Sequence, residues 1–275
     1  MADTLPETRT AAGISYRESG RAGAPALALA LLHGIGSTSA GWRLQFAPLG
    51  ERFRVVAWDA PGYGRSTPLP GEAPEPAAYA RALAGLLDAL GIARVLIGSN
   101  SWGTATAVAF ARLHPQRVSA LVLGGPTVGF AGLPAAERER RVAERVERIR
   151  ALGPERMREQ DSARLVAPGA RPELLGWIRG AAGLSVEGYA QAARMLGRID
   201  CVREIAALEC PVIVVSGEKD VVTPPEANSR PLAAAARHGE LEMVPGCGHL
   251  PHLEHPERFN AAVLRAAARA PVAAA

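Results

Sequence analysis

Short apolar runs, each ending at a turn residue, recur along this chain and sharply limit the folds available to it. The first covers residues 26–32 and ends in His-Gly-Ile-Gly, and the second covers residues 53–58 and ends in Asp-Ala-Pro-Gly. Runs of the same kind cover residues 94–98, 118–123 and 211–215. Continuous runs of this length, bounded by turn residues, are typical of strands buried on both faces of a sheet.

Helix-compatible segments separate these runs. They cover residues 76–90, 102–113, 225–237 and 256–269. The alternation of strand and helix predicts an α/β fold with a parallel sheet flanked by helices on both faces. Ligands bind at the carboxyl ends of the strands in such sheets, so a functional site is expected in the loops that follow the strands.

A long interval between the runs at 118–123 and 211–215 carries no buried-strand pattern. Residues 134–151 place Val142, Val146 and Ile149 on one helical face, with Glu and Arg around the rest. Further helical segments are expected at 154–165, 172–182 and 185–197. The chain is therefore predicted to consist of a core, residues 1–126 and 206–275, and a helical cap or lid, residues 127–205.

The segment Gly98-Ser-Asn-Ser-Trp-Gly103 lies between an expected strand and an expected helix. A sharp strand–nucleophile–helix turn needs small residues two positions before and two after the nucleophile. Ser99 and Gly103 meet this condition for Ser101, whereas bulky Ile97 excludes a turn centred on Ser99. Ser101 is therefore the predicted nucleophile, and the alternative is a plain loop that uses serine as a helix cap.

A serine nucleophile needs a base, and that base needs a carboxylate to orient it. Asp220 follows the expected strand that begins at 212, and His249 follows another expected strand that begins at 241. The order serine, acid, histidine matches that of the strand–turn–helix nucleophile motif. His249 is the predicted general base, with His252 as the alternative, and Asp220 is the predicted acid.

Two backbone N–H groups are expected to bind the oxyanion of the tetrahedral intermediate. One belongs to Trp102, at the start of the helix after Ser101, where the helix dipole favours negative charge. The other belongs to Ile35 within His33-Gly-Ile-Gly36, whose glycines let the backbone turn toward the site. By itself this second segment is also compatible with an ordinary tight turn.

Taken together, LLHGIGSTSAGW, VVAWDAPGYGRS, LIGSNSWGT, GEKDVVTPP and GCGHLPHLEHPERF resemble the α/β-hydrolase superfamily in order and spacing. Within it, the chain is most similar to lidded serine carboxylesterases and 3-oxoadipate enol-lactonases. The resemblance implies an eight-stranded, mostly parallel sheet, a helical lid inserted after the sixth strand, and no cofactor. It also implies that Asp59 in the turn before Ser66 is structural.

The expected activity is hydrolysis of a small carboxylic ester or lactone through an acyl-enzyme on Ser101. C–C bond hydrolases, amidases and cofactor-free haloperoxidases share the same triad and remain alternatives. A non-hydrolytic ligand receptor is an alternative of another class. Haloalkane dehalogenases and epoxide hydrolases use an aspartate nucleophile, so Ser101 argues against both.

The substrate pocket is expected to involve four residues: Gly34, Trp42, Phe130 and Trp177. Five arginines of the cap could bind a substrate carboxylate: Arg138, Arg141, Arg145, Arg156 and Arg158. The competing interpretation is a solvated helix face, with Glu137–Arg141 and Glu144–Arg148 paired four residues apart.

Composition limits the partners. The formal net charge is +4, but the basic residues are spread among acids. The sequence has neither a basic stripe nor an aromatic platform, so nucleic-acid binding is not expected. Cys201, Cys210 and Cys247 lack metal-ligand spacing and are expected to be reduced thiols. The polar N-terminal segment does not resemble a signal peptide, and no apolar run could span a bilayer. A cytoplasmic enzyme acting on a small molecule, without metal or membrane partner, is expected; the oligomeric state is not readable.

Overall fold

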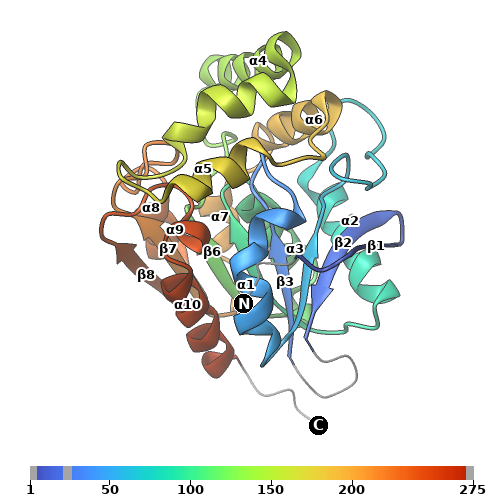
Figure 1. Ribbon diagram of the computed structural model, residues 1–275. Helices are drawn as coiled ribbons and strands as arrows, with labels where there is room; N and C mark the ends of the chain where they lie inside the picture. Colours follow the sequence, from blue (N-terminus) through green and yellow to red (C-terminus); the bar gives the residue numbers. More distant parts are fainter. Residues whose placement is uncertain (1–4, 21–26, 271–275) are drawn as a thin grey trace.

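An eight-stranded sheet forms the centre of the computed structural model, which describes residues 5–20 and 27–270 (Figure 1). Residues 1–4 of the polar N-terminal segment and residue 26 of the first expected strand lie outside the described residues. The strand order is β1-β2-β4-β3-β5-β6-β7-β8. β2 pairs antiparallel with β1 and β4, and all other pairs are parallel. The strands are β1 (Thr8–Ala11), β2 (Ile14–Ser19), β3 (Ala28–Leu32), β4 (Arg54–Trp58), β5 (Val95–Asn100), β6 (Val118–Gly124), β7 (Val212–Gly217) and β8 (Gly239–Val244).

The central strands are apolar on both faces because helices cover the sheet on both sides. In β3, for example, Leu29 and Leu31 pack into one hydrophobic cluster, whereas Ala30 and Leu32 pack into another. Helices α1 (Arg43–Gly50) and α10 (Pro256–Arg269) contribute to the first cluster. Helices α2 (Pro76–Ala89), α3 (Gly103–Leu113), α7 (Cys201–Ile205) and α8 (Ser229–Ala235) contribute to the second. The predicted α/β fold with a mostly parallel sheet is confirmed.

Helices α4 (Ala135–Asp161), α5 (Pro172–Arg179) and α6 (Val186–Leu196) follow β6 and lie above the sheet in Figure 1. α4 is bent at Gly153, whose φ of 70° breaks the helical path, and Pro154 starts the second segment. Val146 and Ile149 are buried, as their helical spacing predicts. These helices occupy the interval assigned above to the cap, and the division into cap and core stays a prediction.

Short elements complete the fold: η1 (Ser39–Trp42), η2 (Pro115–Arg117), η3 (Ser162–Arg164) and α9 (Pro251–Glu254). The hairpin of β1 and β2 has no counterpart among the apolar runs identified in the sequence. None of the helices in the described part of the chain combines the length and apolarity needed to cross a membrane.

Candidate active site

Ser101 sits at a strained turn between β5 and α3. Its φ of 52° lies in the left-handed region, where a non-glycine residue is uncommon. A Cβ atom on Gly103 would collide with the carbonyl group of Leu32, so the residue two positions after Ser101 has to be glycine. Ser99, two positions before, is fully buried, which explains why a small residue stands there. The turn therefore has the tight geometry that the sequence predicts around Ser101.

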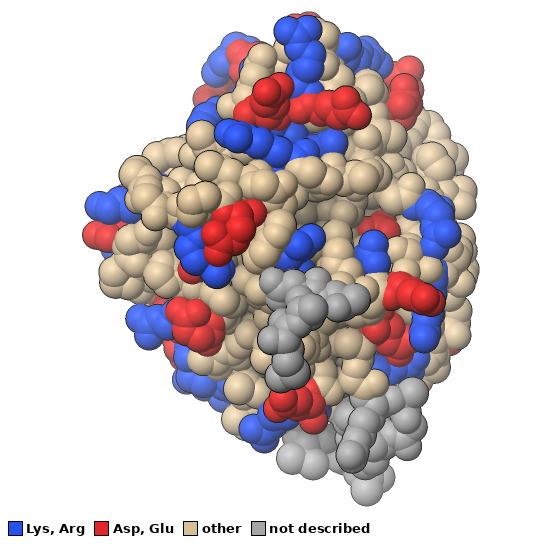
Figure 2. All heavy atoms as spheres, in the orientation of Figure 1, with Lys and Arg blue, Asp and Glu red and all other residues tan. Residues whose placement is uncertain are grey.

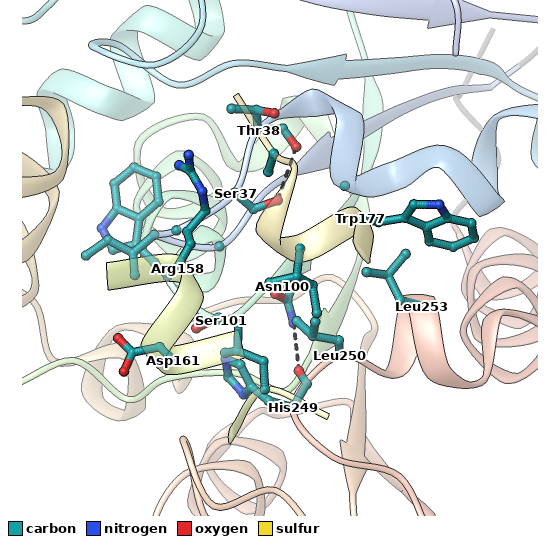
Figure 3. Close-up of a pocket in the computed structure, with 18 of the residues that line it drawn as sticks. Ser37, Thr38, Asn100, Ser101, Arg158, Asp161, Trp177, His249, Leu250 and Leu253 are labelled. Atoms are coloured by element: carbon teal, nitrogen blue, oxygen red, sulfur yellow. Dashed lines mark hydrogen bonds between the residues drawn. The ribbon is translucent and has the colours of Figure 1, made fainter. Parts of the chain in front are cut away.

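Asp220 and His249 lie after β7 and β8 and form a hydrogen-bonded pair. His249 Nδ1 is 2.9 Å from Asp220 Oδ2, and both residues are buried. Ser101 and His249 line the same pocket, and Figure 3 draws Ser101 beside the His249 imidazole. When Nδ1 donates its proton to Asp220, Nε2 is left as the basic nitrogen of the ring.

The Asp220 carboxylate is held in its ionised form. Burial alone would raise its pKa, but hydrogen bonds from His249 and Thr223 outweigh this effect and hold the pKa below its ordinary value. Oδ1 accepts the backbone N–H groups of Val222 and Thr223, at 2.8 and 2.9 Å. The Thr223 hydroxyl lies 2.8 Å from Oδ2 and 3.1 Å from His249 Nδ1. The ionised carboxylate of Asp220 can therefore orient the imidazole of His249.

The two other buried histidines near the site have different environments. His33 Nδ1 lies 2.8 Å from the Gly34 carbonyl, and His33 Nε2 accepts the Ala60 N–H at 3.0 Å. Both ring nitrogens thus brace the turn. His252 packs against Trp42, at 4.4 Å between ring centroids, and burial together with the charge of His249 lowers its pKa to about 3. Its Nδ1 has no hydrogen-bond partner among the described residues, so His252 lacks the carboxylate that a general base needs.

Ile35 and Trp102, the expected oxyanion-binding residues, both line the pocket beside Ser101. The Tyr63 hydroxyl donates to the Ile35 carbonyl at 3.0 Å. The Trp102 indole donates to the Ala192 carbonyl of α6 at 3.1 Å, which joins the turn to the helices above it. Asp59 accepts hydrogen bonds from the Ser39 N–H and the Ser15 hydroxyl, in agreement with a structural role.

The pocket has a volume of about 610 Å³ and lies between the carboxyl ends of the strands and helices α4 and α5. Figure 2 shows the surface hollowed at this level of the molecule. Gly34 and Trp177 line the pocket, as expected. The expectation is wrong for Trp42 and Phe130: Trp42 is fully buried against His252 and Phe259, and Phe130 packs beneath arginines of α4.

The five candidate arginines of the cap occupy different environments. Arg145 and Arg158 line the pocket, whereas Arg138 lines a separate groove between α4 and the end of α6. Arg156 is exposed, and Arg141 pairs with Glu137 as the solvated-face interpretation predicts. The other predicted pair is wrong, because Glu144 binds Arg140 and Arg148 binds Asp161 across the bend of α4.

Three further residues organise the site but were not singled out in the sequence. Thr223 contacts both Asp220 and His249, as described above. Asn100 donates to the carbonyl oxygens of Gly124 and His249, at 3.0 and 3.1 Å, and so connects the turn before Ser101 to the histidine loop. Glu254 is the third. The only sequence signal for Glu254 is its position shortly after His249.

Glu254 connects the histidine loop to the helical segment above it. Its carboxylate accepts the N–H groups of Gly248 and Leu250, on either side of His249, at 3.0 and 3.2 Å. It also accepts the N–H of Ala167, which lies between η3 and α5, at 2.7 Å. The His249 N–H donates to Leu165 of the same segment at 3.0 Å.

We expect Glu254→Gln to lower the free energy of unfolding by about 2 kcal/mol and kcat by about tenfold. The amide replaces an anion that accepts three N–H groups, and its NH₂ group faces donors. Urea unfolding and steady-state kinetics measure the two effects. Glu257→Gln, at an exposed position, is the matched control. If both variants behave alike, Glu254 does not position the histidine loop.

The comparisons with known proteins agree with this architecture. The model of the alpha/beta hydrolase family matches residues 29–262. This chain belongs to that family. The match runs from the second residue of β3 into α10, so it includes β5, β7 and β8, the strands that directly precede Ser101, Asp220 and His249.

The relatives of this alpha/beta hydrolase carry different activities in their names. A 2-hydroxy-6-oxononadienedioate/2-hydroxy-6-oxononatrienedioate hydrolase of Pseudomonas putida is 32% identical over 85% of each chain. Among solved structures, an esterase from Thermogutta terrifontis has a TM-score of 0.81 and 29% identity, covering 95% of this chain and 97% of its own. An enol-lactonase from Burkholderia xenovorans has a TM-score of 0.81 and 25% identity, covering 94% and 99%. The chain is a hydrolase, and these proteins differ in the activity for which they are named.

Within the described residues, no group of three or more His, Cys, Asp or Glu side chains is arranged to hold a metal ion.

Proposed function

We propose that this alpha/beta hydrolase is a serine enzyme that cleaves a small carboxylic ester or lactone. The observation that carries the proposal is the His249–Asp220 pair on the same pocket as Ser101, which stands at a strained turn. Strain of this kind persists at functional sites because the surrounding structure enforces it.

In the proposed mechanism, Ser101 Oγ attacks the substrate carbonyl carbon while His249 Nε2 takes the hydroxyl proton. The Ile35 and Trp102 N–H groups bind the oxyanion. The intermediate collapses, the bond to the leaving alcohol breaks, and His249 returns the proton to that alcohol. Water, deprotonated by His249, then hydrolyses the acyl-enzyme and frees Ser101.

Cleavage of a C–C bond is the second candidate function. The curated relative at 32% identity is named for a dienedioate hydrolase, which favours it, whereas the two solved structures named above favour an ester or a lactone. The same residues serve both reactions. They differ in the leaving group, since in a C–C bond hydrolase a carbon atom has to accept the proton.

Covalent trapping tests the nucleophile. A fluorophosphonate should inactivate the enzyme and add one phosphonyl group to Ser101, located by mass spectrometry of the digested protein. Labelling at another residue, or none in folded enzyme, contradicts the proposal. The ratio of kcat/KM for p-nitrophenyl esters to that for 2-hydroxy-6-oxononadienedioate then distinguishes the two candidate reactions.

The division into a core, residues 1–126 and 206–275, and a cap, residues 127–205, is part of the proposal. So is a cytoplasmic location, which the three free cysteines Cys201, Cys210 and Cys247 support.

A further inference from the structure

Arg158 is a buried cation on the wall of the pocket. It lies in the segment of α4 that follows the bend at Gly153, and only 8% of its surface is exposed. Nε and Nη1 of its guanidinium group are fully buried and have no hydrogen-bond partner among the described residues. Burial lowers its pKa from the ordinary value, partly offset by the charge of Glu155. The side chain nevertheless stays cationic, because arginine is always protonated at neutral pH.

A buried donor without an acceptor destabilises a protein, and the cost is larger for a charged group. On the wall of a pocket, a ligand that supplies the missing acceptor would explain why such a group is kept. The guanidinium fork matches a carboxylate, which can accept two parallel N–H bonds. Arg158 thus has the chemistry of a carboxylate-binding residue.

Most of the charged side chains around the pocket are cations. Besides Arg158, its charged lining residues are Arg17, Arg43, Arg145, Arg164 and Asp161. The one carboxylate in this set, Asp161, is neutralised by Arg148 at 2.7 Å. Arg43 lies over the Trp177 ring, 4.4 Å from its centroid. An excess of cations in a cleft attracts anionic substrates.

The guanidinium of Arg158 lies apart from the reacting atoms. In Figure 3 its side chain extends from α4 into the pocket toward Ser37 and Thr38, whereas Ser101 and His249 lie at the other end of the drawn cluster. A carboxylate bound there would belong to a part of the substrate remote from the bond that is cleaved. Binding energy at such a remote group can orient the carbonyl against Ser101.

We propose that the substrate carries a carboxylate remote from the scissile bond and that Arg158 binds it. This inference rests on the proposed function, because it takes Ser101 as the reacting end of the pocket. Arg158 then selects esters or lactones of dicarboxylic acids over neutral ones of equal length.

The test is a matched pair of substrates. The p-nitrophenyl monoester of adipic acid and p-nitrophenyl hexanoate have the same length and differ by a carboxylate in place of a methyl group. We expect wild-type enzyme to have at least a tenfold higher kcat/KM for the adipate ester. Arg158→Gln should bring the ratio of the two values close to one. Arg150→Gln, which removes an exposed arginine of the same helix, should leave the ratio unchanged.

Equal kcat/KM values for the two esters in wild-type enzyme would overturn the inference and leave the serine hydrolase intact. If Arg158→Gln does not fold, the test is inhibition of p-nitrophenyl hexanoate hydrolysis by wild-type enzyme. Adipate should inhibit this reaction competitively, and hexanamide should not. Equal inhibition by the two compounds overturns the inference. If neither ester is cleaved and Ser101 is not labelled, the proposed function fails. Calorimetric titration of wild-type protein with adipate then tests the carboxylate site directly. Binding of adipate supports the inference, and no binding overturns it.

Discussion

Replacing Ser101 by Ala will lower kcat/KM for p-nitrophenyl esters by about 10⁴-fold or more. The substitution removes only the hydroxyl group, and the proposed acyl-enzyme forms on its oxygen. The fold should survive, because alanine and serine place the same Cβ on a backbone with φ of 52°. Steady-state hydrolysis, with Tm measured alongside, checks both expectations.

Ser99 supplies the matched control, since it stands two residues before Ser101, on β5. It is fully buried, and its hydroxyl has no hydrogen-bond partner among the described residues. Ser99→Ala should therefore stay within about threefold of wild-type activity, because little is lost when an unpaired hydroxyl is removed. Near wild-type hydrolysis by Ser101→Ala, or an equal loss in both variants, would show that Ser101 is not the nucleophile.

The central part of the fold could be predicted because it is governed by burial on both faces. Strands such as β3 and β5 are continuous apolar runs for that reason. The hairpin of β1 and β2 obeys a different rule. It pairs antiparallel at the edge of the sheet, where β1 is half exposed and β2 is fully buried only in its first half, so TRTA and ISYRES carry no apolar run. Such edge strands are visible only once the strand they pair with is known.

The site could be predicted where chemistry restricts residue type and spacing. The turn at Ser101 needs small neighbours, and the acid and histidine each follow a strand. Thr223 and Asn100 escaped prediction because their contacts join segments far apart in the sequence. Two of the three aromatic residues expected in the pocket, Trp42 and Phe130, failed for a related reason. Trp42, for example, suits a pocket or a core equally well, and its packing against His252 and Phe259 decides between them.

The ion pairs of α4 failed because spacing alone assumes a straight helix. Gly153 bends α4, which brings Asp161 to Arg148 and frees Glu144 to bind Arg140.

Asp220→Asn should reduce kcat by about 10³- to 10⁴-fold and change KM little. Asn can keep its oxygen toward the Val222 and Thr223 N–H groups, which places its NH₂ group against His249 Nδ1. An NH₂ donor there requires Nδ1 to act as an acceptor, so the proton moves to Nε2. An imidazole protonated at Nε2 cannot take the proton of Ser101.

Stability should also change with pH in a defined direction. The pKa of Asp220 is lower in the folded protein than its ordinary value, so its ionised form stabilises the fold at neutral pH. That contribution is complete above the ordinary pKa and is lost as the pH falls through the lowered value. Wild-type protein should therefore exceed Asp220→Asn in free energy of unfolding at pH 7, and the difference should shrink below about pH 4.

Asp200→Asn is the matched control for both effects. Asp200 caps α7 by accepting the N–H groups of Val202 and Arg203, away from the pocket. Because Asn is an equally good cap, this variant should lose less than about 1 kcal/mol of stability and keep wild-type kcat. A kcat of Asp220→Asn within tenfold of wild type, under conditions where both proteins are folded, would mean that another group orients His249. Thr223, at 3.1 Å from Nδ1, would then be the residue to replace next.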